Sequence, residues 1–228
     1  MDMDWQNRTK QLIGDEGVLL LSRKKVLVAG LGGVGGSCLE ALARSGIGTL
    51  GIIDKDLIEL SNLNRQIIAI RETLGERKVD VAKDRVRKIN PSALVLCYDE
   101  FYQELPNRED LLSQFDYIVD AIDDIQGKID LIKDAFDLDI PLVSAMGMGN
   151  RMDPLKLVEA DIYETQYCPL AKAVRKNLRD LGILSLKVVY SKEKCVKIHP
   201  PGTMAFVPNA CGLALASIVI RDLLKEIL

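Results

Sequence analysis

A glycine-rich turn between an apolar strand and a helix is the feature that most constrains the fold of this 228-residue chain. The predicted strand Lys25–Ala29 runs into Gly30-Leu31-Gly32-Gly33-Val34-Gly35, and a helix is predicted over Val34–Ser45. Glycines let the backbone turn tightly and approach a phosphate, while the free N–H groups and positive dipole end of the next helix face the anion. This order of elements predicts a nucleotide site whose phosphate contacts come from Gly30, Gly32, Gly33 and Gly35.

A polar cluster after the second strand indicates which nucleotide chemistry the turn serves. The predicted strand Thr49–Ile53 ends in Asp54, where such folds place a carboxylate on ribose hydroxyls. A second carboxylate, an amide, a guanidinium and an ammonium follow, on Asp56, Asn62, Arg65 and Lys78. The cations Arg65 and Lys78 would have no role in hydride transfer to a nicotinamide. Attack on an α-phosphate, in contrast, builds negative charge that they can neutralise. We therefore predict that ATP, and not NAD, binds here.

Alternation of short apolar strands with helices predicts an α/β fold, Rossmann-like and doubly wound, with a mainly parallel sheet. Further strands are expected at Leu94–Tyr98, Tyr117–Ala121 and Pro141–Ala145, and further helices at Val79–Lys88, Asn107–Ser113 and Gln126–Leu138. Ligands of such sheets bind over the carboxyl ends of the strands. Gly30, Asp54 and the pair Asp120 and Asp123 all fall at such ends, so one site can collect them.

The regular alternation of strands and helices ends after Gly149. We therefore divide the chain into a nucleotide-binding core at residues 1–149 and a C-terminal subdomain at residues 150–228. The second part is predicted to contain strands Leu157–Ile162 and Ser185–Tyr190, a basic helix Pro169–Leu181, a polar crossover Ser191–Met204 and a closing helix Ala210–Leu228. No repeat or flexible linker separates the parts. We expect an α+β elaboration on the same sheet, forming one integrated domain with the core.

Three carboxylates at the end of the fourth predicted strand compete for one role. A carboxylate there faces the glycine turn across the sheet and can hold a Mg²⁺ ion that bridges ATP phosphates. We assign this role to Asp123, with Asp120 and Asp124 as alternatives. One of the three is expected to cap the following helix.

The basic residues are unevenly distributed. The net charge is −3, but residues 170–200 carry a net charge of +6, which leaves −9 on the rest of the chain. Such a run is often only a solvated helix face, yet a basic patch on an acidic body is also typical of proteins that bind RNA. The basic residues of this stretch are Lys172, Arg175, Lys176, Arg179, Lys187, Lys192, Lys194 and Lys197.

Five dispersed cysteines form no C-x-x-C pair. An odd, dispersed set indicates a reducing compartment, so neither a disulfide framework nor structural zinc is expected. The N-terminal residues lack an apolar signal region, and the longest apolar run near the C-terminus, Ala210–Ile220, is about half the length that a membrane span needs. We expect a cytoplasmic protein with no membrane partner.

Taken together, these motifs resemble the ThiF/MoeB/HesA superfamily of adenylating enzymes, the ubiquitin-activating type. The shared motifs are the glycine turn, Arg44–Gly48, Asp54–Asp56, Asn62–Gln66, Lys78 and Asp120–Asp123. Within the superfamily, the chain is similar to the tRNA threonylcarbamoyladenosine dehydratase branch. The branch markers are Arg44–Gly48, the DAID form of Asp120–Asp123, Met152–Pro154, Asp161–Thr165 before Pro169–Ala171, and Val189–Ser191.

The resemblance implies an ATP-dependent dehydratase that acts on tRNA. The threonyl carboxylate of N6-threonylcarbamoyladenosine would attack the α-phosphate of ATP, and the neighbouring carbamoyl group would then close a ring and expel AMP. It implies that Arg65 and Lys78 neutralise the phosphate, Asp123 holds the metal, and Asp54 contacts the ribose. Asn62 would orient phosphate or substrate.

The resemblance also implies a homodimer. Arg8 matches an N-terminal arginine that reaches ATP in this superfamily, often from the partner subunit. In a symmetric pair, each subunit would complete the site of the other.

A covalent role for a cysteine is left open. Superfamily members that form thioesters carry a nucleophilic cysteine in the crossover region, and the candidates here are Cys168, Cys195 and Cys211. The lysines around Cys195 would favour its thiolate, but intramolecular ring closure already has a high effective molarity and needs no covalent relay. His199, the only histidine, is expected at the surface or in contact with tRNA and not as a general base.

Two other functions compete with the dehydratase hypothesis. One is adenylation of the C-terminus of a ubiquitin-like sulfur carrier, which would make a sulfur-acceptor protein the partner. Such enzymes commonly hold zinc through paired C-x-x-C motifs, which this sequence lacks. The other is a scaffold with a vestigial nucleotide pocket, against which the intact Arg65, Lys78 and Asp123 argue.

Overall fold

The computed structural model describes residues 5–195, 198, 201–225 and 227, and a seven-stranded sheet forms its centre. The strand order is β3-β2-β1-β4-β5-β7-β6, and all neighbours pair in parallel except β6, which is antiparallel to β7. The predicted fold class, with its C-terminal elaboration on the same sheet, is confirmed. The strands are β1 Lys25–Ala29, β2 Thr49–Ile53, β3 Leu94–Tyr98, β4 Tyr117–Asp120, β5 Leu142–Ala145, β6 Leu157–Asp161 and β7 Lys187–Ser191.

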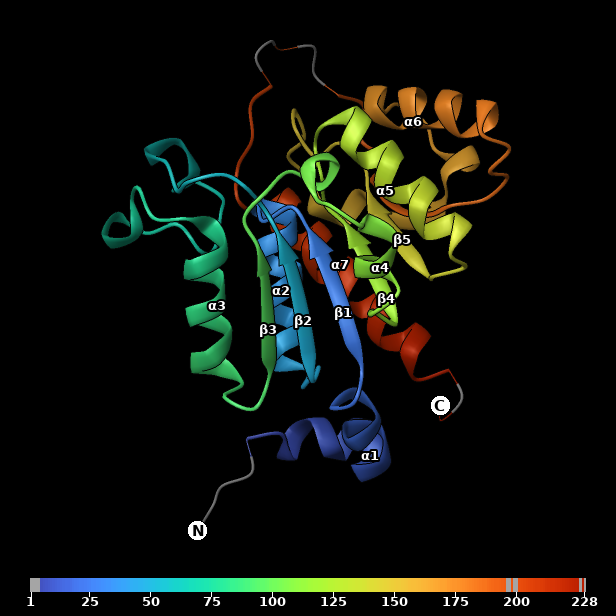
Figure 1. The fold of residues 1–228 in the computed structure, drawn as a ribbon. Coiled ribbons are helices and arrows are strands. Elements are labelled where there is room, and N and C mark those ends of the chain that lie inside the picture. The colour runs from blue at the N-terminus through green and yellow to red at the C-terminus, as the bar shows by residue number, and fades with distance from the viewer. Residues whose placement is uncertain (1–4, 196–197, 199–200, 226, 228) are drawn as a thin grey trace.

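Helices cover both faces of this sheet (Figure 1). Buried side chains of α2, α3 and α7 pack on one face, those of α4 and α5 pack on the other, and α6 packs on α5 and β7. The helices are α1 Asn7–Leu21, α2 Gly33–Arg44, α3 Lys78–Ile89, α4 Arg108–Leu112, α5 Ile125–Asp137, α6 Pro169–Asp180 and α7 Phe206–Leu223. Five short 3₁₀ turns complete the described chain: η1 Leu60–Asn62, η2 Arg71–Thr73, η3 Tyr102–Glu104, η4 Pro154–Lys156 and η5 Ile162–Glu164.

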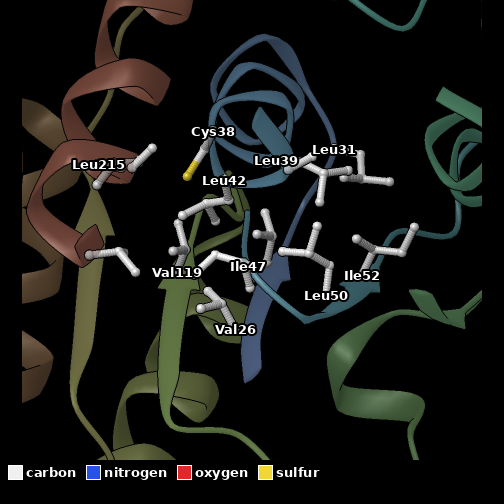
Figure 2. Close-up of a cluster of buried hydrophobic side chains, with 14 of the residues drawn as sticks. Val26, Leu31, Cys38, Leu39, Leu42, Ile47, Leu50, Ile52, Val119 and Leu215 are labelled. Carbon is white, nitrogen blue, oxygen red and sulfur yellow. The ribbon is translucent and has the colours of Figure 1, made fainter. Parts of the chain in front are cut away.

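The largest core lies between the sheet and the pair α2 and α7. Figure 2 shows Val26 of β1 and Val119 of β4 beneath Leu42 of α2, with Leu215 of α7 beside them. Each fully buried side chain of this size stabilises the fold by about 1.5–3 kcal/mol relative to exposure. The two helices pack closely, because a Cβ atom added at Gly212 would lie 2.2 Å from the carbonyl oxygen of Val34.

By length and composition, α7 passes a test for membrane-spanning helices, as many core helices of soluble proteins also do. It is the one helix of the described residues that does so. Its buried positions, among them Cys211, Leu215 and Val219, belong to the core shared with α2 and the sheet. The structure therefore accounts for its apolar composition by packing.

The chain differs from the predicted elements at its two ends. The helix α1 was not predicted; its sequence lacks a clear apolar stripe, and a kink at Gly14, with φ of +73°, interrupts it. The last helix begins at Phe206 instead of Ala210. Pro208 is tolerated there because it lies in the first turn, where the backbone N–H groups have no partner within the helix.

The carboxyl ends of β1, β2, β4 and β5 meet at one end of the sheet, where the long connections gather (Figure 1). The helix α1 lies at the opposite end, below β1 and β2 (Figure 1). The N-terminal helix and the residues that follow the carboxyl ends of the strands therefore lie at opposite ends of the sheet.

Candidate nucleotide-binding active site

A cavity of about 900 Å³ lies over the carboxyl ends of the strands. Its walls come from the glycine turn, from the segments that follow β2, β3, β4 and β5, and from the first residues of α3, α6 and α7. A volume of this size accommodates a nucleoside triphosphate together with part of a second substrate. The predicted residues Gly30, Asp54, Arg65, Lys78 and Asp123 all line it.

The glycine turn is shaped by two close backbone approaches. Gly30 has φ of +90°, and a Cβ atom there would lie 2.6 Å from the carbonyl oxygen of Ala121. At Gly35 a Cβ atom would lie 1.7 Å from the carbonyl oxygen of Gly30. Gly32 and Gly33 line the cavity at the start of α2. Gly35 is not among the lining residues, and its missing Cβ lets α2 approach the glycine turn closely.

Asp54, Asp56 and Lys78 form a charged wall beside the turn. The Lys78 ammonium lies 2.6 Å from Asp56 and 3.5 Å from Asp54, and its side chain is almost completely buried. Asp54 also accepts the N–H groups of Leu31 at 2.6 Å and Asp56 at 2.9 Å. Burial raises the pKa of the Asp54 carboxyl, although the Lys78 ammonium and these N–H groups oppose the shift. A carboxylate and a buried cation are thus fixed at the edge of the cavity.

Asn62 and Arg65 line the next part of the wall and also shape their own segment. Asn62 Oδ1 accepts the N–H of Glu59 at 3.0 Å, and Arg65 Nη1 donates to the Ser61 carbonyl at 2.8 Å. Gln66, which the sequence reasoning did not single out, is buried in the same wall, and its Oε1 has no hydrogen-bond partner among the described residues. Such an atom can pair with a ligand.

The structure separates the three competing aspartates by environment. Asp120 is fully buried and accepts from Lys128 at 2.6 Å and from the Ser144 hydroxyl at 2.5 Å. Asp124 caps α5 by accepting the N–H of Gly127 at 2.7 Å. Asp123 is exposed to the cavity and has no hydrogen bond or ion pair among the described residues. Asp123 is therefore the carboxylate available to a ligand.

A metal ion here would need ligands beyond the protein. No group of three or more His, Cys, Asp or Glu side chains suited to a metal occurs in the described part of the chain. Mg²⁺ commonly binds through one or two carboxylates together with substrate phosphates and waters. Asp123 beside a nucleotide cavity fits that pattern.

Lys128 is a buried charged residue that the sequence reasoning missed. Its ammonium contacts Asp120, the Ser144 hydroxyl and the Ala145 carbonyl at 2.6 Å, 3.2 Å and 3.0 Å. These contacts join the ends of β4 and β5 to α5 directly beneath the cavity. One signal could have revealed it, since Lys128 lies on the helix face of Ile132 and Ala135, both of which are buried.

Comparison with known proteins decides the family. The ThiF family profile matches residues 6–226. The chain belongs to the ThiF family.

Within this family, tRNA threonylcarbamoyladenosine dehydratases are highly similar to the chain. The tRNA threonylcarbamoyladenosine dehydratase of Bacillus subtilis strain 168 is 39% identical over 97% of this chain and 95% of its own length. The crystal structure of the E. coli tRNA N6-threonylcarbamoyladenosine dehydratase with AMP is 31% identical, has a TM-score of 0.91, and is matched over 99% of this chain and 97% of that chain. Its complex with ATP is 32% identical, with a TM-score of 0.92 and the same coverage.

Arg8, another predicted site residue of this ThiF-family chain, does not lie at the cavity. It is exposed on α1, at the opposite end of the sheet, and donates to Gln11 at 3.4 Å. Within a single chain, Arg8 does not line the cavity. Any contribution to catalysis would have to come from another subunit.

The basic residues of the C-terminal part differ in their exposure and in their partners. Lys172, Lys176 and Arg179 lie on the exposed face of α6, the helix whose first turn contributes Leu170 to the cavity wall. Arg175 instead donates to the Thr165 carbonyl at 2.9 Å, and Lys187 pairs with Asp222. Lys192 and Lys194 are exposed after β7, while Lys197 and His199 lie outside the described residues.

The three candidate cysteines differ in access to the cavity. Cys211 is fully buried in the core, and burial raises the pKa of its thiol to about 12, which argues against a nucleophilic role. Cys168 is buried at the start of α6, where its Sγ accepts the N–H of Ala171 at 3.5 Å. Cys195 is half-buried, 4.0 Å from the carbonyl oxygen of Gly149, a residue of the cavity wall. Of the three, only Cys195 combines partial exposure with proximity to the cavity.

Proposed function

We propose that this chain is an ATP-dependent tRNA threonylcarbamoyladenosine dehydratase. The observation that carries the proposal is the single cavity that collects the glycine turn, Asp54, Lys78, Arg65 and Asp123. The proposal is supported by a solved relative of the same fold that binds ATP and AMP and is named for this activity. The substrate pair would therefore be ATP and a tRNA that carries N6-threonylcarbamoyladenosine.

The reaction has two steps. A carboxylate oxygen of the threonyl group attacks the α-phosphorus of ATP, the bond between this phosphorus and the oxygen bridging to the β-phosphate breaks, and pyrophosphate leaves. The carbamoyl group then attacks the activated carbonyl carbon, the ring closes, and AMP and a proton are released. Both steps are accelerated by groups that stabilise charge on the α-phosphate.

The residues of the wall suit these steps. Asp54 lies where a ribose hydroxyl can donate to it, and Lys78 and Arg65 place positive charge along the path of the phosphates. Asp123 would hold Mg²⁺, which screens the phosphate charges when bound. The second step is intramolecular, so the enzyme needs only to exclude water from the acyl adenylate.

We further propose a cytoplasmic homodimer. Free thiols at all five cysteines and a tRNA substrate support a reducing, cytoplasmic location. The position of Arg8 opposite the cavity supports a partner subunit, because the superfamily resemblance assigns this arginine to ATP. Neither a sulfur-acceptor protein nor a carrier tail is favoured by any feature of the cavity.

Pyrophosphate release tests the function. We expect release with ATP and modified tRNA, and none with unmodified tRNA or with a ubiquitin-like carrier protein. Lys78→Ala should lower the rate by about 100- to 1000-fold, since it removes a charge that stabilises the transition state, while tRNA association stays nearly unchanged. Lys133→Ala, in an exposed pair with Asp137, is the matched control. Release with the carrier protein alone would instead establish the sulfur-carrier alternative.

A further inference from the structure

Tyr167 adopts a backbone conformation that its side chain does not favour. Among the described residues, four that are not glycine have positive φ: Asn107, Asp139, Asn150 and Tyr167. Asn and Asp tolerate this region, whereas for a bulky residue it is a strained exception. Tyr167 has φ of +55° and is 53% exposed, so burial does not compensate for the strain. Strain of this kind persists where the surrounding structure imposes it.

Arg151 binds the backbone of Tyr167 beside the segment that forms part of the cavity wall. Its guanidinium is only 3% exposed and donates to the carbonyl oxygens of Tyr167 at 3.4 Å and Gly149 at 3.2 Å, and also to that of Gly147. Gly147 and Gly149 line the cavity. The same buried cation thus ties the backbone of Tyr167 to the wall formed by the segment after β5.

A lysine lies over the exposed ring. Lys194 Nζ is 5.3 Å from the centroid of the Tyr167 ring and comes from the segment after β7. The exposed cations of α6 begin a few residues after Tyr167, at Lys172, and Leu170 between them lines the cavity. The ring therefore lies at a positively charged edge of the cavity.

The other end of the cavity suits ATP. Asp54 marks the ribose, and Lys55 lies over the ring of Phe101, 4.6 Å from its centroid, in the same wall. With ATP across the glycine turn, the side bounded by Gly147, Gly149 and Leu170 is left for the second substrate. Tyr167 lies on that side.

We propose that Tyr167, with Lys194 over its ring, is a stacking platform for an unpaired base of the RNA substrate. Proteins recognise single-stranded RNA by stacking splayed bases on aromatic rings, and neighbouring cations bind the backbone phosphates. Holding the ring outward at a fixed angle would direct the modified nucleotide into the cavity. This inference rests on the proposed function and names one subsite for its RNA.

Four variants at two positions test the platform. Binding of tRNA carrying N6-threonylcarbamoyladenosine is measured for Tyr167→Ala, Tyr167→Asn, Tyr167→Phe and the control Phe136→Ala. Phe136 is 56% exposed near the far end of α5, so it matches Tyr167 in type and exposure but not in place. Melting temperature and ATP affinity are measured in parallel.

We expect Tyr167→Ala and Tyr167→Asn to weaken tRNA binding by about 10- to 100-fold, the effect of losing one stacked base. The slope of affinity against salt should stay unchanged, because every cation that binds a phosphate is still present. Tyr167→Asn should melt at or above the temperature of the wild type, since Asn tolerates positive φ, so its weaker binding could not be attributed to unfolding. Tyr167→Phe and Phe136→Ala should bind as the wild type does, and ATP affinity should not change.

Normal tRNA binding by Tyr167→Ala and Tyr167→Asn would overturn the platform. So would a loss in which tRNA and ATP affinity fall together, because that pattern indicates a structural role for the ring. Failure of the proposed function gives a different result, since the wild type itself would then release no pyrophosphate with modified tRNA.

Discussion

At the scale of single residues, the site depends on which charges are already paired. Asp120 and Lys128 neutralise each other beneath the cavity, and Asp124 is committed to the start of α5. Asp123, between them in sequence, has no such partner among the described residues. The three aspartates of this short motif thus have three different environments, and Asp123 is the one whose carboxylate is left unpaired at the cavity.

Substitution of the two exposed aspartates should separate their roles. Asp123→Asn should raise the Mg²⁺ concentration needed for half-maximal pyrophosphate release by about 10-fold or more, with little change in stability. Asp124→Ala should lower the free energy of unfolding by about 1 kcal/mol through loss of the helix cap, and leave the Mg²⁺ requirement unchanged. Mg²⁺ titration and urea unfolding of both variants measure this. A Mg²⁺ effect confined to the Asp124 variant would contradict the assignment.

At the scale of elements, Asp222 connects α7 to two strands. Its carboxylate accepts from the Tyr117 hydroxyl of β4 at 2.7 Å and pairs with Lys187 of β7. Burial raises the pKa of Asp222, but hydrogen bonds from Lys187, Lys225 and Tyr117 outweigh it and lower the pKa from 3.8 to about 2. A carboxyl whose pKa is lower in the folded state stabilises the fold above its unfolded pKa and loses that effect as the pH falls through the folded value.

Asp222→Asn should therefore destabilise the fold in a pH-dependent manner. We expect a loss of about 1–2 kcal/mol near pH 7, discounted for partial exposure, and a difference from the wild type that shrinks between about pH 4 and about pH 2. Urea unfolding at several pH values measures it. Asp137→Asn is the control and should have almost no effect, because Lys133, itself exposed, is the one ion-pair partner of Asp137 among the described residues. A difference that is independent of pH would show that packing, and not charge, explains the loss.

The exposed basic face of α6 is another feature at the scale of elements. Replacing Lys172, Lys176 and Arg179 by Ala should weaken tRNA binding and reduce the salt slope by about 2 to 3, because each cation that no longer neutralises a phosphate lowers the slope by about one unit or slightly less. Arg175 is excluded because it fastens η5 and the segment after it to α6.

The matched control replaces three other exposed cations, Arg87, Lys88 and Lys133, near the ends of α3 and α5 away from the cavity. It should leave the salt slope of tRNA binding unchanged, and both triple variants should bind ATP as the wild type does. Equal effects of the two triple variants would mean that net charge alone attracts tRNA.

At the scale of the whole molecule, the cavity lies over the carboxyl ends of the strands, and α1, which carries Arg8, lies at the opposite end of the sheet (Figure 1). If Arg8 serves a partner's site, Arg8→Ala and Lys78→Ala homodimers should each be inactive. Mixing and reassociating the two should restore about a quarter of wild-type activity, because half of the dimers are hybrids and each hybrid has one intact site. Pyrophosphate release by the mixture measures this. A mixture as inactive as its components, with hybrid dimers demonstrated, would exclude action in trans.

The sequence alone determined the nucleotide-binding half of this protein. Strand, glycine turn, helix and the terminal Asp54 are local patterns, and the physics that sets them acts over a few neighbouring residues. The boundaries of β1, β2 and β3 were predicted correctly for the same reason. Membership of the ThiF family followed from these motifs, because their spacing encodes a site and not only a fold.

Only the tertiary structure decided which of the predicted side chains are free. Asp120 is paired because Lys128 and Ser144 come from α5 and β5, and Arg175 is removed from the basic face because Thr165 folds back onto it. The backbone carbonyl of Tyr167 accepts a hydrogen bond from Arg151, sixteen residues earlier in the chain. Hydrogen bonds between residues distant in sequence carry no periodic signal, so no pattern along the chain could predict them.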